Sequence, residues 1–197
     1  YCWGLGTTGQ TGTGLNTTNY TATPISFPAP ATSIVKIFTS TDSIYTPGGG
    51  TNSFYAIDSN GAVFAWGYGA AGVLGDGTTN SRPAPVQTGT TPFNGKQITK
   101  ISLSNQHGGY GHVAAIDSLG QLYTWGNNAD GQLGQGNTTT LLTPTIVSGF
   151  NNVVDVVATG GYNTTDGDTG NIFVLRSNGT VWTAGNGQFG QLGNGTL

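Results

Sequence analysis

Two short clusters in this chain hold residues of the types that bind metal ions. Asp166 and Asp168 form the only close pair among the 8 acidic residues, all of which are aspartates. A calcium ion takes about six or more oxygen ligands, and an EF-hand loop ends in a glutamate, which this sequence lacks. His107 and His112 stand near one another, but no Cys, Asp or Glu lies near enough in sequence to complete a zinc site. We therefore expect no metal site and interpret the aspartate pair as part of a solvated loop.

The residues that could support catalysis are equally isolated. Cys2, the single cysteine, has no His or other base beside it, and the sequence contains no Gly-x-Ser-x-Gly segment. Three Gly-x-Leu-Gly-x-Gly segments, which begin at Gly72, Gly131 and Gly190, are similar to phosphate-binding loops. A phosphate-binding loop must join a strand to the N-terminus of a helix, however, and the sequence predicts no helix after any of them. We therefore interpret these segments as structural turns, and we predict a protein that is not an enzyme and has no cofactor.

The composition limits the fold classes and the classes of partner that are possible for this chain. Glycine accounts for 35 of the 197 residues, charged residues for 7% and aromatic residues for 10%. Helix-favouring residues are scarce, which excludes a helical bundle, whereas the apolar residues suffice for a packed core. A net charge of −3 without a basic cluster argues against nucleic acid as a partner. No apolar run reaches the ~20 residues that cross a bilayer, so we expect no membrane span.

A repeat with a fixed step organises the whole chain. Trp66 and Trp125 are 59 residues apart, Ala184 follows after another 59, and Trp3 precedes Trp66 by 63. The Gly-x-Leu-Gly-x-Gly segments keep the 59-residue step. The same step separates the glycines that end three polar turns, Gly61, Gly120 and Gly179. Three landmarks on one step indicate a repeat architecture.

Each repeat is predicted to hold four short strands. The first and second are apolar runs, and a polar turn that ends in glycine joins the second to the third. The expected ranges are 34–37, 98–101 and 153–156 for the first strands, 54–57, 113–116 and 172–175 for the second, and 1–4, 63–67, 122–126 and 181–185 for the third. A fourth strand at the outer edge, where proline is tolerated, is expected after Pro24, Pro85 and Pro144. The tryptophans of the third strands could stack on a ligand, but their repeated position favours packing between neighbouring sheets.

Four strands in a repeat of about 60 residues, with glycine and aromatic landmarks, are typical of a β-propeller blade. We therefore predict an all-β fold, a β-propeller of four-stranded antiparallel blades, with about three and a half blades present. The segments from Trp66 to Gly77 and from Trp125 to Gly136 resemble the repeat of the regulator of chromosome condensation family. The family's usual histidine matches His112, and the resemblance implies that this side chain makes a buried hydrogen bond between strands.

The predicted blades divide the chain into four parts. Residues 1–27 form a half blade, 28–89 and 90–149 two whole blades, and 150–197 a blade without its last strand. The resemblance implies a ring of seven blades, which would take about 413 residues. We therefore expect this chain to be part of a longer one that closes such a ring.

The loops between first and second strands vary most among the repeats and are the predicted binding site. They span 41–52, 105–112 and 159–170, and each holds one tyrosine among Gly, Asn and Thr: Tyr45, Tyr110 and Tyr162. Tyrosine among small polar residues is typical of binding surfaces. The same tyrosines could instead cover the rim of the propeller.

Low charge and abundant Thr and Asn favour an exported protein. We expect a bacterial secreted or cell-surface member of the family, a non-enzymatic, adhesin-like module whose loops bind a protein or a glycan. A bacterial secretion apparatus is a further expected partner. The alternative that the resemblance implies is a guanine nucleotide exchange factor-like regulator of a small GTPase, although the chain has no basic tail.

Overall fold

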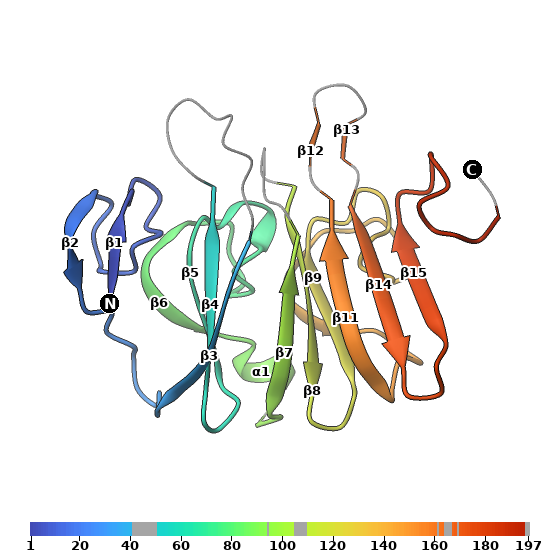
Figure 1. Cartoon of the computed structure of the whole chain (residues 1–197), viewed down its shortest axis with the longest axis horizontal. Coiled ribbons are helices and arrows are strands. Elements are labelled where there is room, and N and C mark those ends of the chain that lie inside the picture. Colours follow the sequence, from blue (N-terminus) through green and yellow to red (C-terminus); the bar gives the residue numbers. More distant parts are fainter. Residues whose placement is uncertain are drawn as a thin grey trace.

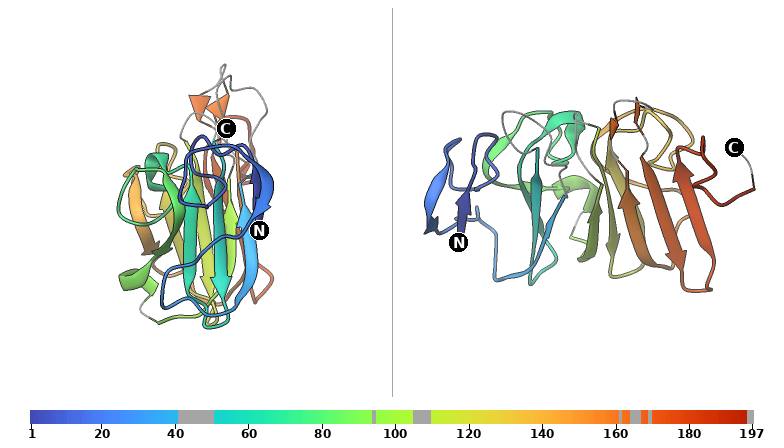
Figure 2. Two further views of the ribbon diagram at one scale, coloured as in Figure 1. Left: turned by 90° about the vertical axis from the view of Figure 1, so that its left-hand side faces the viewer. Right: turned by 45° about the horizontal axis from the view of Figure 1, so that its top comes forward.

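The computed structural model of the chain is a row of β-sheets that follow one another in chain order (Figure 1). It describes residues 1–40, 51–93, 95–104, 110–160, 162–163, 167–168 and 170–195. The two ends of the chain lie at opposite ends of the row, and a view turned about the horizontal axis shows the sheets standing side by side (Figure 2). Among the described residues, helix is limited to the short turns η1 (Ala70–Gly72) and α1 (Thr90–Phe93).

Four antiparallel sheets make up the row, and we call them blades 1 to 4. Blade 1 pairs β1 (Cys2–Gly4) with β2 (Asn19–Thr23). Blade 2 has the order β3 (Ile34–Thr39), β4 (Ser53–Asp58), β5 (Val63–Gly67) and β6 (Arg82–Thr88). Blade 3 has the order β7 (Ile98–Leu103), β8 (His112–Asp117), β9 (Leu122–Gly126) and β10 (Leu141–Ile146). Blade 4 holds β11 (Val153–Thr159), β14 (Asn171–Arg176) and β15 (Val181–Gly185). These sheets confirm the predicted all-β fold of four-stranded antiparallel blades.

The fourth strands do not begin where the sequence predicts. β6 and β10 contain Pro85 and Pro144 instead of following them, and β2 ends before Pro24. β2, β6 and β10 are outer strands, each paired on one side in the described sheets. An outer strand leaves alternate N–H groups without a ladder partner, so it accepts proline within its length. The prediction of a strand after each proline is therefore wrong in its bounds.

The turn between the second and third strands is closed by an aspartate. Asp58 accepts hydrogen bonds from the N–H groups of Asn60 and Ala62, both at 2.9 Å, and from the hydroxyl of Thr32. Burial favours a raised pKa for this carboxyl group, but these hydrogen bonds outweigh burial and hold its pKa below the ordinary value. Asp117 repeats the arrangement in blade 3. The polar turns are therefore fixed by side-chain hydrogen bonds as well as by glycine.

Neighbouring blades are joined by the tryptophan of the third strand. Trp66 Nε1 donates to the carbonyl oxygen of Gln10 at 3.1 Å, and Trp125 Nε1 donates to that of Val73 at 2.8 Å. Both indoles are buried, and each reaches the glycine-rich connection of the preceding blade. These contacts confirm the predicted packing of these two tryptophans between sheets.

A second aromatic contact at each junction is not visible in the repeat pattern of the sequence. Phe27 lies edge-on to Trp66 with ring centroids 5.7 Å apart, and Phe93 lies edge-on to Tyr123 at 5.1 Å. Phe150 contacts Trp182 in the same way at 5.4 Å. The three phenylalanines are separated by 66 and 57 residues, so they do not follow the 59-residue step of the other landmarks.

The Gly-x-Leu-Gly-x-Gly segments are tight turns whose second glycine faces the next blade. Gly75 has φ +69°, and a Cβ there would lie 2.9 Å from Trp125 Nε1. Gly134 has φ +66°, but its nearest neighbour would be the Cβ of Ala184 at 3.8 Å. The interpretation of these segments as structural turns is confirmed, and the close approach is needed only where a tryptophan follows.

We expect Gly75→Ala to destabilise the chain more than Gly134→Ala does. Both substitutions put a Cβ into the left-handed region, at a cost of about 1–2 kcal/mol each. Only the change at Gly75 also overpacks the junction against Trp125, which adds about 1–3 kcal/mol. Urea titration of both variants measures the difference in the free energy of unfolding. Equal costs would show that the approach of Gly75 to Trp125 carries no packing constraint.

Candidate functional site

One end of the blades carries every described connection between a first and a second strand. β3, β7 and β11 end there, and β4, β8 and β14 begin there (Figure 1). In blade 4 the connection contains β12 (Tyr162–Asn163) paired with β13 (Gly167–Asp168), which project beyond β11 and β14. We call this end the hairpin face. The prediction of a loop across 159–170 is wrong at these two short strands, because their backbones pair.

The three predicted tyrosines are placed unequally. Tyr45 lies outside the described residues, as do His107 and Asp166. Tyr162 begins β12, where it is paired with Asp168. Tyr110 precedes β8 and is half-buried. The described backbone therefore brings positions 110 and 162 to the hairpin face on neighbouring blades.

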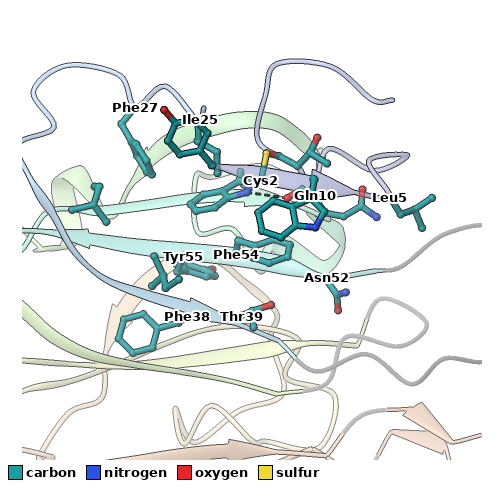
Figure 3. Close-up of a pocket in the computed structure, with 16 residues that line it drawn as sticks. Cys2, Leu5, Gln10, Ile25, Phe27, Phe38, Thr39, Asn52, Phe54 and Tyr55 are labelled. Carbon is teal, nitrogen blue, oxygen red and sulfur yellow. Dashed lines mark hydrogen bonds between the residues drawn. The ribbon is translucent and has the colours of Figure 1, made fainter. Parts of the chain in front are cut away.

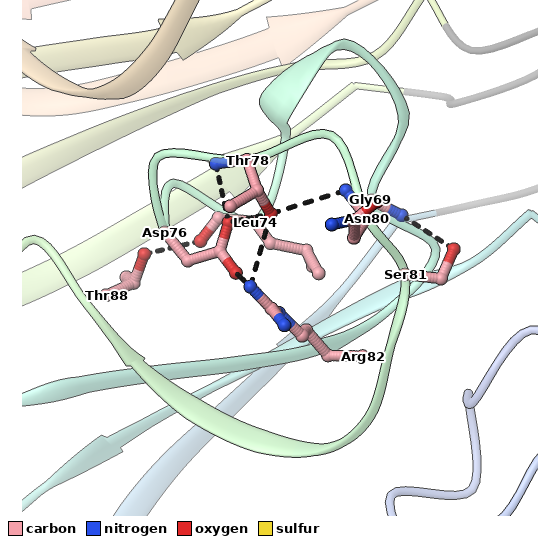
Figure 4. Close-up of polar contacts among 8 residues, drawn as sticks. All are labelled: Gly69, Leu74, Asp76, Thr78, Asn80, Ser81, Arg82 and Thr88. Atoms are coloured by element: carbon pink, nitrogen blue, oxygen red, sulfur yellow. Dashed lines mark hydrogen bonds and ion pairs between the residues drawn. The ribbon is translucent and has the colours of Figure 1, made fainter.

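The connection between β5 and β6 lies at the same end and is braced by an ion pair (Figure 4). Arg82 Nε donates to Asp76 Oδ2 at 2.6 Å, and Arg82 Nη2 lies 2.5 Å from the same oxygen. The other carboxylate oxygen accepts the N–H of Thr78 at 3.0 Å and its hydroxyl at 2.9 Å. The corresponding positions of blade 3 hold Gln135 and Leu141, so the brace belongs to blade 2. A nearly buried carboxylate with two kinds of donor holds this loop in one conformation.

His112 is fully buried where blade 3 meets blade 4. Its Nε2 lies 3.1 Å from the carbonyl oxygen of Asn171, which confirms the expected buried hydrogen bond and shows that it joins two blades. The equivalent side chains bond within their own blade, Ser53 to the carbonyl of Tyr68 and Asn171 to that of Asn186. Burial lowers the pKa of His112 to about 4, and the hydrogen bond to Asn171 opposes it only in part. The imidazole is therefore neutral at neutral pH.

Metal ligands and nucleophiles stay apart in the part of the chain that the structure describes. No group of three or more His, Cys, Asp or Glu side chains comes close enough there to hold a metal ion. Cys2 Sγ donates to the carbonyl of Thr11, and burial raises the pKa of its thiol against the effect of the terminal amino group. A thiol with a raised pKa is a poor nucleophile.

Among the described residues, no helix has the length and apolar character to cross a membrane.

An apolar groove of about 720 Å³, which the sequence does not predict, lies between blade 1 and blade 2 (Figure 3). Cys2 and Trp3 of β1 line one side, and Ile37, Phe54 and Trp66 of blade 2 line the other. Trp3 is 68% exposed and Ile37 is 76% exposed. We call this feature the β1 groove. The strand count could have indicated it, because only a third and a fourth strand are predicted for the first repeat.

A family model matches the central part of the chain. The regulator of chromosome condensation (RCC1) repeat model matches residues 60–116 and 120–165, which together are just over half of the sequence. These ranges cover the second half of blade 2 (β5 and β6), nearly all of blade 3 and the beginning of blade 4.

Two curated relatives share this repeat with the chain. The E3 ubiquitin-protein ligase HERC2 of Homo sapiens is 31% identical over 148 residues, which are 74% of this chain and 3% of that protein. The protein RCC2 homolog of Danio rerio is 40% identical over 84 residues, which are 43% of this chain and 16% of that protein. The chain therefore spans only a small part of the length of these relatives.

The fold is similar to that of Prp20p from Saccharomyces cerevisiae. The TM-score is 0.67 at 24% identity, and the match covers 100% of this chain and 43% of Prp20p. That crystal structure is described together with the binding properties of Prp20p to Gsp1p and histones. At this level of identity the likeness establishes the fold alone, a partial β-propeller.

Proposed function

The chain belongs to the RCC1 repeat family, and from this premise we propose that it is a non-enzymatic module that binds another protein through the hairpin face. The observation that carries the proposal is the difference between the two ends of the blades. At the hairpin face the first and second strands are joined by connections of varied length, including the projecting β12–β13 hairpin. At the opposite end the second and third strands of blades 2 and 3 are joined by four-residue turns closed by Asp58 and Asp117, beside the connections from one blade to the next, one of which holds α1. Variable loops held by a rigid scaffold are where recognition sites most often lie.

The chemistry of the hairpin face favours a protein as the partner. Tyr110 and Tyr162 stand among Gly, Asn and Thr, a combination that supplies aromatic contact area together with adaptable hydrogen bonds. Prp20p, which shares the fold, is described as binding Gsp1p and histones, so this scaffold holds protein partners in at least one other case. We favour a protein over a glycan for that reason.

Photo-crosslinking from defined positions tests this proposal. A crosslinking amino acid at position 110 or 162 is expected to give adducts with the partner in extracts of the source organism. The matched control is Leu119, which is 69% exposed in a turn at the opposite end of the blades. Adducts from 110 and 162 should exceed those from 119 several-fold. Equal yields from both ends, or none from the hairpin face, would remove the hairpin face as the binding surface.

We further propose that the protein acts outside the cell, as an exported or surface-displayed module. The low charge and the abundance of Thr and Asn support this location, and export would make a bacterial secretion apparatus a transient partner. Fractionation of the tagged full-length protein in its own organism tests it. Retention of the tag in the cytosol would contradict this part of the proposal without affecting the hairpin face.

A second candidate function is the regulation of a small GTPase by nucleotide exchange. The similarity to Prp20p supports it, since that protein is described as binding Gsp1p, whereas the acidic net charge of −3 offers no support for a chromatin role. Release of a fluorescent GDP analogue from a panel of small GTPases separates the two candidates. The binding-module proposal expects no acceleration by the chain, and a clear acceleration would replace it.

A further inference from the structure

His112 stands between two connections of the hairpin face, that of blade 3, which holds Tyr110, and that of blade 4, which holds Tyr162. It opens β8 directly after the first connection, and its backbone N–H donates at 2.9 Å to the hydroxyl of Ser104, the residue that follows β7. Its Nε2 lies 3.1 Å from the carbonyl oxygen of Asn171, the first residue of β14 after the second connection. One side chain therefore joins the ends of both connections.

The end of the second connection packs directly on the imidazole. A Cβ at Gly170 would lie 2.9 Å from Cε1 of His112 and 3.2 Å from its Nδ1. The same Cβ would lie 2.8 Å from Nε2 of Gln132, which is also buried. Position 170 therefore has no room for a side chain, and the connection contacts blade 3 through its backbone.

The second ring nitrogen of His112 has no hydrogen-bond partner among the described residues. Because a carbonyl oxygen only accepts, Nε2 carries the proton in the bond to Asn171, and Nδ1 presents a lone pair. A proton on Nδ1 would create a fully buried positive charge whose new N–H group has no acceptor. Such a charge is strongly disfavoured, which is why the pKa of His112 is lowered to about 4. The ring therefore accepts a proton readily only after it leaves this position.

The described charged side chains of the neighbouring elements do not compensate such a charge. Asp130, in the connection after β9, bonds to Asn186, and burial raises its pKa, so acid favours its buried position. Asp168 is paired through its backbone with Tyr162 in the projecting hairpin. The remaining charged residues of β7, β8, β11 and β14 lie in the half of each strand nearer the opposite end and have hydrogen-bond partners there: Lys100, Asp117, Asp155 and Arg176. Of the described groups at this junction, His112 is the one that acid would dislodge.

We propose that His112 makes the hairpin face sensitive to acid, because protonation of its ring releases Gly170 and Asn171 from blade 3. The connection that holds Tyr162 is then no longer fixed relative to the connection that holds Tyr110. A partner that contacts both connections would lose affinity in acid. This last step rests on the proposed function of the hairpin face, whereas the release itself does not.

Amide hydrogen exchange of the chain alone tests the release. The N–H groups of Asn127 and Asn186 donate to the carbonyls of Gly111 and Gly170 at 2.9 and 3.1 Å, so they report on the two connections that His112 joins. From about pH 7 to about pH 4.5 we expect both protection factors to fall roughly 50-fold, because the released ring regains an ordinary pKa and binds a proton that the buried ring does not.

Blade 2 supplies a matched control within the same chain. The N–H group of Tyr68 donates to the carbonyl of Asn52 at 3.0 Å in the equivalent place, where Ser53 replaces His112. The protection factor of this amide should stay nearly constant over the same range. His112→Asn should remove the pH dependence at the two reporters of blades 3 and 4.

Three results would overturn the proposal. An equal fall at Tyr68 would show that acid opens the whole chain rather than this junction. Constant protection at Asn127 and Asn186 would show that the buried ring accepts the proton in place. A pH dependence that persists in His112→Asn would assign the release to another group. The measurement needs no partner, so its failure leaves the binding proposal intact, and a failed crosslinking test leaves the release intact.

Discussion

Trp125→Ala is expected to lower the free energy of unfolding by about 3–5 kcal/mol, because it empties the centre of the junction between blades 2 and 3. The side chain is fully buried, donates to the carbonyl of Val73 and lies edge-on to Phe93 with ring centroids 6.2 Å apart. Its removal leaves a cavity where the two blades meet, since the surrounding strands are fixed by their own ladders. Guanidinium titration followed by circular dichroism measures the loss.

Two further variants separate the effect of burial at the blade junction from the effect of the indole N–H group. Trp182→Ala removes an indole that is 49% exposed, packs edge-on against Phe150 and has the hydroxyl of Thr180 as its described hydrogen-bond acceptor, so we expect a loss of about 1–2 kcal/mol. Trp125→Phe keeps most of the buried volume and removes the N–H group, at an expected cost of about 1–2 kcal/mol. If Trp125→Ala cost no more than Trp182→Ala, the blades would not depend on this residue for their cohesion.

The strands at the centre of each blade can be predicted because several constraints coincide there. The turn that ends at Gly61 needs a residue with φ +79°, and the strand that follows needs an aromatic residue facing the preceding blade at Trp66. Each constraint admits few residue types, so the repeat is visible in one sequence. The assignment to a β-propeller follows from these constraints alone.

The bounds of the outer strands could not be predicted from the sequence, because fewer structural constraints act on the residues of these strands. A strand paired on one side accepts Pro85 or Pro144 within its length, so proline marks the strand without marking its start. The edge-on phenylalanines, such as Phe93, come from connections of unequal length and keep no fixed step. The β12–β13 hairpin occurs in one repeat only and has no second copy to compare.

Of the two candidate surfaces, the hairpin face could be predicted from the sequence and the β1 groove could not. Tyr110 and Tyr162 are expected at the same end of the blades from topology alone. The first and second strands of each blade are antiparallel, so the loop between them lies at the same end in every blade. The β1 groove depends on what covers Ile37, which a residue's own sequence neighbourhood does not reveal. The sequence shows that the residues of this groove are apolar, but whether they are exposed depends on how the blades pack together.

His112 is expected to make the stability of the chain fall as the pH drops from about 6.5 to about 4. Above pH 6.5 the imidazole is neutral in both the folded and the unfolded state, so its contribution is fully present. Between these values the unfolded state binds a proton that the buried ring does not, because burial lowers the folded pKa to about 4. In the middle of this window each pH unit costs about 1.4 kcal/mol, and the slope is smaller near both pKa values, so the whole window costs about 2–3 kcal/mol.

His112→Asn is the variant that isolates this effect. Asn171 at the equivalent position donates its amide to the carbonyl of Asn186 at 2.7 Å, and the introduced amide can reach the corresponding carbonyl of Asn127. The variant should lose the bond between blades 3 and 4 at every pH, at a cost of about 1 kcal/mol. It should also be less sensitive to pH between 6.5 and 4 than the parent chain. The prediction would be wrong if the stability curves of the two proteins ran parallel across this window. The imidazole of His112 would then accept a proton in the folded state without penalty and keep its hydrogen bond to Asn171.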